Sequence, residues 1–378
     1  MRDQFLLDPS VIFLNHGSFG ACPRPVFDQY QAWQRDLERQ PVEFLGRRYT
    51  DLYQHARAEL ARYLGTDADH LIFVENATAG LNIVARSLQL AEGDEILTTD
   101  HEYGALNLTW QYICRETGAT IVAQALPDPL VEPQAVVDAI WDGVTERTRV
   151  LFLSHITSVT ALILPVAQLI QRARAAGILT IIDGAHVPGH LPLDLDALGA
   201  DFYSGNLHKW LCAPKGSAFL YARPEHHDWL DPLVISWGWD GAGLFQRMAW
   251  QGTRDIAAFL TVPTAIEFQQ AHDWAQVRQQ CHALAMTAAL RVCELFGTHP
   301  RAMPRFHGQM AIAPLPACDP AVVKRRLYDE YRVEIPITRH GDQSFVRISI
   351  QAYNTRADVE RLLHALRVIF EIPDDATS

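Results

Sequence analysis

The 378-residue chain lacks an apolar run of about 18 residues, which is the length that a membrane-spanning helix needs. Residues 1–17 contain one arginine but no apolar stretch leading to a small-residue cleavage site, so no signal peptide is predicted. Positive charge is also scarce: the formal net charge is −12, and the basic residues are scattered. Nucleic-acid binding requires a concentrated basic surface. We therefore expect a cytoplasmic protein that binds neither membranes nor nucleic acids.

The chain has few cysteines, and none of them form a CxxC pair. A chain of this length does not need a disulfide framework for stability, and zinc sites usually show closely paired cysteines. The six cysteines are predicted to be reduced thiols: Cys22, Cys114, Cys212, Cys281, Cys293 and Cys318.

Lysine is the scarcest charged residue. Only three of the 32 basic residues are lysines, namely Lys209, Lys215 and Lys324. A solvated surface position is the usual interpretation of a single lysine, but this chain hardly uses lysine for that purpose. Lys209 follows a predicted strand and lies between a histidine and a tryptophan. Burial there would lower its pKa and favour the neutral amine that forms imines.

The hydrophobic content of 48% and the length predict two domains with sizeable cores. The first part alternates helix-like segments with continuously apolar runs, a pattern that is typical of a mostly parallel α/β sheet covered on both faces. We expect seven strands, at 71–74, 95–99, 120–126, 149–156, 178–183, 201–205 and 217–222. Functional groups in such sheets collect beyond the carboxyl ends of the strands.

After residue 260 the pattern changes to that of a smaller α+β domain. A long helix is predicted over about 262–296, strands at 310–315 and 345–350, and a final helix over about 355–370. The last five residues, 374–378, are predicted to form a frayed tail.

Two strand ends carry residues that suggest a phosphorylated aromatic cofactor. Residues 75–80 place small and polar side chains at the start of a helix, which suits phosphate, although an ordinary N-cap by Asn76 or Thr78 explains the same residues. Asp183 ends the strand 178–183. A buried carboxylate needs a positive partner, and a protonated pyridine nitrogen is one; an aspartate that caps a turn is the alternative.

Arg347 lies within the apolar strand 345–350. Because guanidinium does not lose its proton, an arginine there needs an anion. A substrate carboxylate held by two hydrogen bonds would meet this need, and so would a structural salt bridge.

Together these segments resemble the class V aminotransferase family. The motifs that carry the resemblance follow the family's order over nearly the whole chain: a threonine in the phosphate loop, DGAH at 183–186, HK at 208–209 with PKG at 214–216, GT at 252–253, and RIS at 347–349 with YNT at 353–355. The resemblance implies pyridoxal 5′-phosphate (PLP) as cofactor and a fold-type-I architecture. We expect an N-terminal arm (1–20) that packs with the small domain, a large PLP-binding domain (21–260) and a small C-terminal domain (261–378).

The resemblance also implies roles around the cofactor ring. Lys209 would be the Schiff-base lysine, and Asp183 would pair with the pyridine nitrogen. His186 would lie near the phenolic oxygen, and His101 would stack on the face of the ring.

Phosphate binding is implied for Thr78 with the backbone of Ala77, helped by Asn206 and His208. The chain reads SGNLHK where the family more often has SGHK, which favours Asn206 over Ser204 as the phosphate contact. Thr253 in the GT loop would reach the phosphate of a neighbouring subunit and so implies a homodimer.

Substrate binding is implied for Arg347, which would hold the α-carboxylate, and for Asn15 and His16 of the N-terminal arm. Within the family, the chain resembles the isopenicillin N epimerases in particular, through residues 14–20, 101–105 and 205–211. We therefore expect an enzyme that acts at the Cα of an amino acid or of a substrate derived from one.

The sequence leaves three reactions open: epimerisation, elimination by a lyase, and transamination. Lys209 is the natural base for the Cα proton, and epimerisation requires a second acid on the other face, either Tyr103 or His101. A C–S or β-elimination lyase would use the same first step, and an aminotransferase is a third reading. Persulfide chemistry is disfavoured because no cysteine lies about 15 residues before Arg347, where the resembling cysteine desulfurases carry theirs; the nearest preceding one is Cys318.

A metal-dependent hydrolase is a remote alternative, through His186 and His190. Pro188 and Gly189 lie between these histidines and argue against the helix that would align them, so no metal is predicted.

Overall fold

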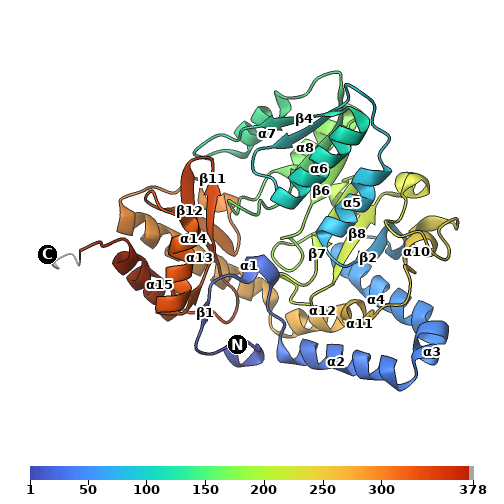
Figure 1. The fold of residues 1–378 in the computed structure, drawn as a ribbon, viewed down its shortest axis with the longest axis horizontal. Coiled ribbons are helices and arrows are strands. Elements are labelled where there is room, and N and C mark those ends of the chain that lie inside the picture. Colours follow the sequence, from blue (N-terminus) through green and yellow to red (C-terminus); the bar gives the residue numbers. More distant parts are fainter. Residues whose placement is uncertain (374–378) are drawn as a thin grey trace.

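A seven-stranded sheet runs through the larger part of the computed structural model, which describes residues 1–373 (Figure 1). Its strands are β2 (Leu71–Val74), β3 (Glu95–Thr99), β4 (Thr120–Gln124), β5 (Thr148–Ser154), β6 (Leu179–Asp183), β7 (Phe202–Asn206) and β8 (Ala218–Ala222). The spatial order is β2-β8-β7-β6-β5-β3-β4. β8 is antiparallel to both of its neighbours, and all other pairs are parallel. The predicted mostly parallel seven-stranded sheet is confirmed.

Helices cover this sheet on both faces. Successive side chains of a strand point to opposite faces, and every residue of β7 and β8 is buried, so neither face meets solvent there. The helices between the strands are α5 (Ala77–Ser87), α6 (Gly104–Thr117), α7 (Pro133–Trp141), α8 (Val166–Ala175) and α9 (Leu195–Leu198). The helices before β2 are α1 (His16–Phe19), α2 (Arg24–Arg39), α3 (Pro41–Glu43) and α4 (Tyr49–Leu64), and those after β8 are α10 (Gly243–Met248) and α11 (Ala257–Leu260).

A second, smaller body forms around a three-stranded antiparallel sheet in the order β11-β12-β9 (Figure 1). Its strands are β9 (Met310–Pro314), β11 (Ile337–His340) and β12 (Gln343–Ser349), and its helices are α13 (Trp274–Phe296), α14 (Pro320–Tyr331) and α15 (Arg356–Ile369). A separate buried cluster fills the space between them. The N-terminal segment joins this body, since β1 (Ile12–Phe13) pairs in parallel with β10 (Val333–Glu334).

The long helix predicted over 262–296 is two helices. α12 (Val262–Ala271) ends before Asp273, whose φ of 45° lies in the left-handed region that an α-helix does not tolerate. The Asp273 carboxylate then accepts a hydrogen bond from the backbone N–H of Gln276 and caps α13. The buried apolar side chains of α12 belong to the larger buried cluster. The apolar periodicity continues across the break, which is why the sequence alone suggested one helix.

Within residues 1–373, no helix combines the length and hydrophobicity that crossing a membrane requires. The predicted frayed tail, 374–378, lies outside the described residues.

Candidate active site

A cavity of about 400 Å³ opens at the carboxyl ends of the central strands. The last residues of three adjacent strands line it: Ser154 of β5, Asp183 of β6 and Asn206 of β7. This is the edge at which functional groups of parallel sheets collect. The remaining lining residues are Ser18, Phe19, Asn76, Ala77, Thr78, Tyr103, Ile156, Ser158, Ala185, His186, His208 and Lys209.

Lys209 lines the cavity just beyond the end of β7. Burial lowers its pKa to about 8, because the charged ammonium loses its hydration; the Asp183 carboxylate partly opposes this shift. The Lys209 Nζ lies 3.1 Å from the His186 Nε2. A lysine with this pKa is partly a neutral amine at physiological pH and therefore reacts with aldehydes.

Asp183 ends β6 with its side chain in the cavity wall. Only 4% of the residue is exposed, and its Oδ1 accepts a hydrogen bond from the Ala185 N–H at 2.9 Å. Burial raises the pKa of this carboxyl group, so its charged form lacks sufficient partners within the protein alone. The next residue must be glycine, since a Cβ on Gly184 would lie 1.9 Å from a ring carbon of Tyr203. The site is thus built to offer a carboxylate to a cationic group in the cavity.

The N-terminus of α5 faces the cavity through Asn76, Ala77 and Thr78. Asn76 caps the helix by accepting a hydrogen bond from the Ala79 N–H at 2.8 Å. The Asn206 Oδ1 accepts one from the Ala77 N–H at 2.9 Å and so ties the helix start to the end of β7. The N-cap and the phosphate interpretations are therefore compatible. The Asn76 side chain caps α5, and the positive end of the helix still faces the cavity.

Ser204 is turned away from the cavity. Its hydroxyl donates to the Phe219 carbonyl at 2.7 Å within the sheet, whereas Asn206 and His208 line the cavity.

Arg347 lies behind two of the lining serines. Its Nη1 donates to the Ser158 carbonyl at 2.5 Å and its Nη2 to the Ser18 hydroxyl at 2.9 Å. Only 5% of the residue is exposed, and burial lowers its pKa to about 10. Among residues 1–373 its Nε is buried without a hydrogen-bond acceptor, and its other contacts are uncharged oxygens. The guanidinium therefore has no anion from the described chain to balance it.

His101 is not among the residues that line the cavity. Its ring stacks on that of His340 with centroids 3.9 Å apart, and its Nδ1 lies 2.8 Å from the Thr160 hydroxyl. Asp100 lies 3.5 Å from the Nε2 of each histidine. These contacts hold the His101 ring against β11, so the structure does not place it for stacking on a ring in the cavity. Tyr103, two residues later at the N-cap of α6, lines the cavity instead.

Three further predicted site residues lie outside the cavity lining. The Asn15 side chain donates to Glu334, and His16 is fully buried beneath the lysine, with its Nε2 3.0 Å from the Lys209 carbonyl. Thr253 is exposed on the loop before α11. Asn15 and His16 are thus engaged in holding the N-terminal segment and the lysine backbone in place.

A buried glutamate beside the cavity was not predicted from the sequence. Glu102 accepts hydrogen bonds from the Ser154 N–H at 2.8 Å, from the Ser154 hydroxyl at 2.5 Å and from the Thr99 hydroxyl at 2.7 Å. Burial raises its pKa to about 7. Its position next to His101 in the sequence could have drawn attention to it, but only the fold shows that it fixes the cavity rim at Ser154.

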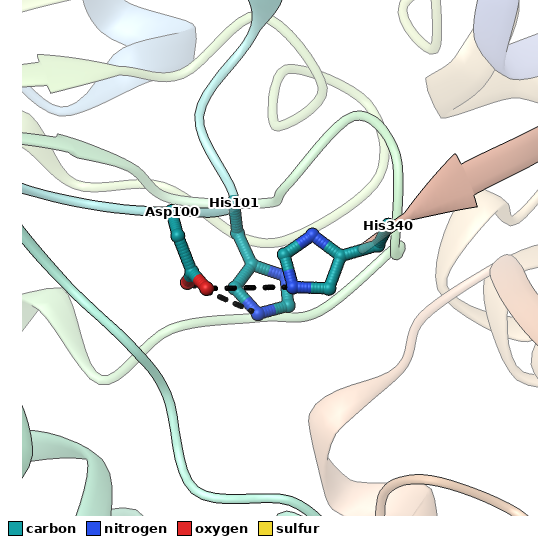
Figure 2. Close-up of side chains that lie close together, drawn as sticks. All are labelled: Asp100, His101 and His340. Atoms are coloured by element: carbon teal, nitrogen blue, oxygen red, sulfur yellow. Dashed lines mark ion pairs between the residues drawn. The ribbon is translucent and has the colours of Figure 1, made fainter. Parts of the chain in front are cut away.

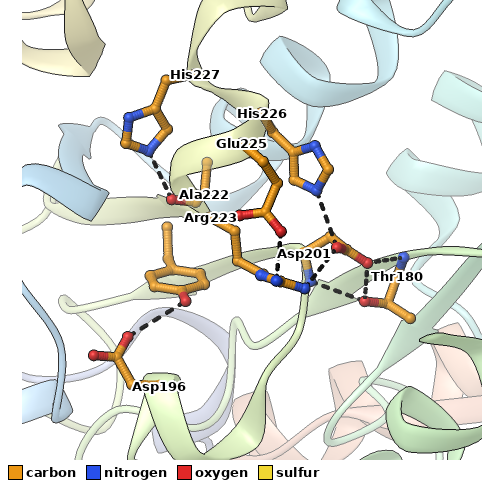
Figure 3. Close-up of polar contacts among 9 residues, drawn as sticks. Thr180, Asp196, Asp201, Ala222, Arg223, Glu225, His226 and His227 are labelled. Carbon is orange, nitrogen blue, oxygen red and sulfur yellow. Dashed lines mark hydrogen bonds and ion pairs between the residues drawn. The ribbon is translucent and has the colours of Figure 1, made fainter. Parts of the chain in front are cut away.

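Two clusters of histidine and acidic residues in the described part of the chain have spacings close to those of metal sites, and both lie away from the cavity. In the cluster of Figure 2 the two imidazoles stack almost in parallel, at 25°, so their nitrogen lone pairs do not converge on one point. In the cluster of Figure 3, Asp201 already pairs with Arg223 and His226 and accepts two hydrogen bonds from Thr180. We interpret both as structural contacts.

The side chains of His186 and His190, weighed above as a remote alternative for metal binding, are also engaged in other contacts. The His190 Nδ1 lies 3.0 Å from the backbone carbonyl of His186, and the His186 ring contacts Lys209 and Trp210. This arrangement leaves the two rings without a common ligand position.

Three comparisons show which known proteins the chain is similar to. The sequence model of the family described as aminotransferase class V matches residues 20–362. Isopenicillin N epimerase of Amycolatopsis lactamdurans is 38% identical, and the alignment covers 97% of each chain. The putative L-cysteine desulfhydrase 1 of Oryza sativa subsp. japonica is 30% identical over 98% of this chain and 85% of its own. A solved structure of a C-DES variant, with glycine covalently linked to its PLP cofactor, superposes with a TM-score of 0.81 at 21% identity, covering 97% of this chain and 98% of that chain.

Proposed function

Because the chain belongs to the class V aminotransferase family, we propose that it is a PLP-dependent enzyme that inverts the Cα of an amino acid or of an amino-acid-derived substrate. The observation that carries this proposal is one cavity lined by a half-buried lysine of lowered pKa, a buried carboxylate that forms no ion pair within residues 1–373, and a helix N-terminus. Epimerisation is favoured over the other reactions because isopenicillin N epimerase shares 38% identity with almost the whole chain.

PLP is the cofactor of this family, and the cavity residues fit it. Lys209 would bind its aldehyde, Asp183 would pair with the protonated pyridine nitrogen, and the start of α5 with Thr78 would hold the phosphate. Asn206 and His208 would complete the phosphate site, and His186 would lie near the phenolic oxygen. When bound, the cofactor draws electrons from whichever Cα bond of the substrate breaks.

The chain's own residues would choose that bond and move the proton. Arg347 would fix the substrate carboxylate, and because Ser18 and Ser158 hold the guanidinium from two sides, the carboxylate would be held in one orientation. The Lys209 amine would take the Cα proton on its side. Tyr103 comes from a different loop and lines the same cavity, so it is the better placed of the two predicted candidates for the second acid.

We expect Tyr103→Phe to lower the rate of Cα inversion by roughly 10²–10⁴, the usual contribution of a general acid. Deuterium exchange at Cα in D₂O should change far less, because Lys209 would still remove the proton. The measurement is chiral chromatography of the product beside NMR of the Cα position. Tyr112→Phe, on the outer side of α6, is the matched control and should leave both rates unchanged. Equal loss of inversion and exchange would contradict the role of Tyr103.

A C–S or β-elimination lyase is the second candidate, favoured by the 30% identity to a putative L-cysteine desulfhydrase. The same lysine and carboxylate would serve it, so a direct assay decides. Holoenzyme incubated with L-cysteine and with other L-amino acids is expected to yield the D-isomer, whereas release of pyruvate and sulfide would establish the lyase instead. Formation of a keto acid without elimination would point to an aminotransferase.

The uptake of PLP by cofactor-free protein should depend on pH through Lys209. The neutral amine is the reactive form and the pKa is about 8, so the uptake rate should rise roughly tenfold per pH unit below pH 8 and level off above it. Stopped-flow absorbance from pH 6 to 9 measures this. An unchanged rate across that interval would contradict a lysine with this pKa.

We also propose a homodimer with shared active sites. Thr253, which the resemblance assigns to phosphate binding, is exposed and outside the cavity of its own chain. A neighbouring subunit would give it a phosphate to bind.

A further inference from the structure

A chain of three side chains leads from the protein core to the reactive amine. The Trp210 indole N–H donates to the His186 Nδ1 at 3.2 Å, and the His186 Nε2 lies 3.1 Å from the Lys209 Nζ. Trp210 is completely buried, and His186 is 2% exposed. Water therefore does not compete for the contact between Trp210 and His186.

The hydrogen-bonding capacity of each nitrogen determines which atom carries each proton. An indole nitrogen only donates, so the His186 Nδ1 must be an acceptor and carry no proton. A neutral imidazole then carries its proton on Nε2, the atom that faces Lys209. The contact is consequently His186 Nε2–H to the lone pair of Lys209 Nζ, which exists only when the lysine is neutral. An ammonium group would point its N–H bonds at another N–H.

The surroundings hold this arrangement in place. The Trp210 ring packs between His16 and His190, with ring centroids 4.9 and 4.1 Å away. The Gln309 N–H donates to the His190 Nε2 at 2.6 Å, so the His190 proton lies on Nδ1 and is donated to the His186 carbonyl at 3.0 Å. Both the ring and the backbone of His186 are therefore fixed.

Charges around the pair do not undo this assignment. Burial lowers the pKa of His186 well below its usual value, and Lys209 and Arg347 lower it further, so the imidazole stays neutral. The charged groups that act on Lys209 are Asp183, which raises its pKa, and Arg347, which lowers it. His190 and His208 are also neutral near pH 7, since burial lowers their pKa values to about 3 and about 4.

We propose that Trp210 is a positioning residue: its indole N–H fixes the His186 tautomer, and that tautomer keeps the Lys209 amine unprotonated before the cofactor binds. This inference rests on the proposed role of Lys209 as the cofactor-binding lysine. Trp210 and the His186 tautomer would thereby assist the binding of the cofactor. The positions of the two ring nitrogens of His186 support this role.

The test uses cofactor-free protein and titrates the lysine itself. Brief labelling with acetic anhydride at a series of pH values, followed by peptide mass spectrometry, measures the neutral fraction of each lysine. Lys215 and Lys324, the only other lysines, serve as references within the same sample. In Trp210→Phe, which removes the N–H but keeps a ring between His16 and His190, the Lys209 midpoint should rise by about one pH unit, or a tenfold smaller neutral fraction at pH 7.

Trp274→Phe is the matched control. Trp274 is also a buried tryptophan, but its indole donates to the Gly189 carbonyl at 3.2 Å, so its replacement should leave the Lys209 midpoint unchanged. His186→Ala should raise the midpoint as Trp210→Phe does, and adding Trp210→Phe to it should have no further effect, because the two act through one contact.

Two results would overturn the proposal: an unchanged midpoint in a folded Trp210→Phe protein, or a full shift by Trp210→Phe in the His186→Ala background. Circular dichroism and the Lys215 midpoint verify folding in each variant. Failure of the proposed function is visible separately, since PLP would then not attach to wild-type Lys209 whatever its titration.

Discussion

Replacement of Lys209 by alanine is expected to abolish covalent attachment of PLP and to lower turnover by roughly 10³-fold or more. The lysine would act twice, first as the amine that binds the cofactor and then as the base that removes the Cα proton. No other lysine is placed to substitute for it: Lys215 donates to the Gly20 carbonyl at 3.0 Å, and Lys324 is exposed on α14.

The measurement for Lys209→Ala is reduction with borohydride followed by mass spectrometry of the peptides. Wild-type protein should carry the cofactor mass on the peptide that contains Lys209, and the variant should carry none. Lys324→Ala is the control and should behave as wild type in labelling and in activity. Cofactor mass on Lys215 or Lys324 in the wild type, or full activity of Lys209→Ala, would refute the assignment.

Asp183→Asn is expected to lower turnover by roughly 10²-fold or more for every substrate, because a buried cation that loses its partner costs about 3–5 kcal/mol. The amide keeps the shape of the side chain but not its charge, and the protonated pyridine nitrogen would then lack a counterion. Steady-state kinetics at saturating PLP measures the loss.

The melting temperature gives an independent test of the role of Asp183. Burial raises the pKa of this carboxyl, so in cofactor-free protein its charge is unfavourable, and Asp183→Asn should leave the melting temperature of that form unchanged or higher. The variant should instead lose most of the stabilisation that PLP gives to the wild type.

Asp201→Asn is the matched control for Asp183→Asn. Asp201 is also buried but lies before β7, at the opposite end of the sheet, and it pairs with Arg223 and His226 (Figure 3). Its replacement should lower the melting temperature with and without PLP and leave cofactor affinity unchanged. If Asp183→Asn behaved in the same way, Asp183 would be a structural residue rather than the cofactor's counterion.

The sequence by itself determined the sheet and most of the cavity. Apart from the edge strand β4, the strands of the sheet are almost wholly buried and rich in apolar residues, so their sequences could be recognised in isolation. Parallel strands bring their carboxyl ends to one edge. Asp183, Asn206 and Lys209 therefore had to lie near one another. Because the chain has only three lysines, Lys209 could be distinguished from an ordinary surface lysine.

Only the tertiary structure decided between neighbours within a loop. His101 and Tyr103 are two residues apart, and nothing local sets which one turns to the cavity; the contact with His340, from a strand more than two hundred residues later, holds His101 away. Asn15 and His16 are likewise held outside the cavity lining by partners from β10 and the C-terminal segment. The proton positions on His186 and Lys209 depend on the same long-range packing, since a tautomer is set by whichever donor or acceptor meets each ring nitrogen.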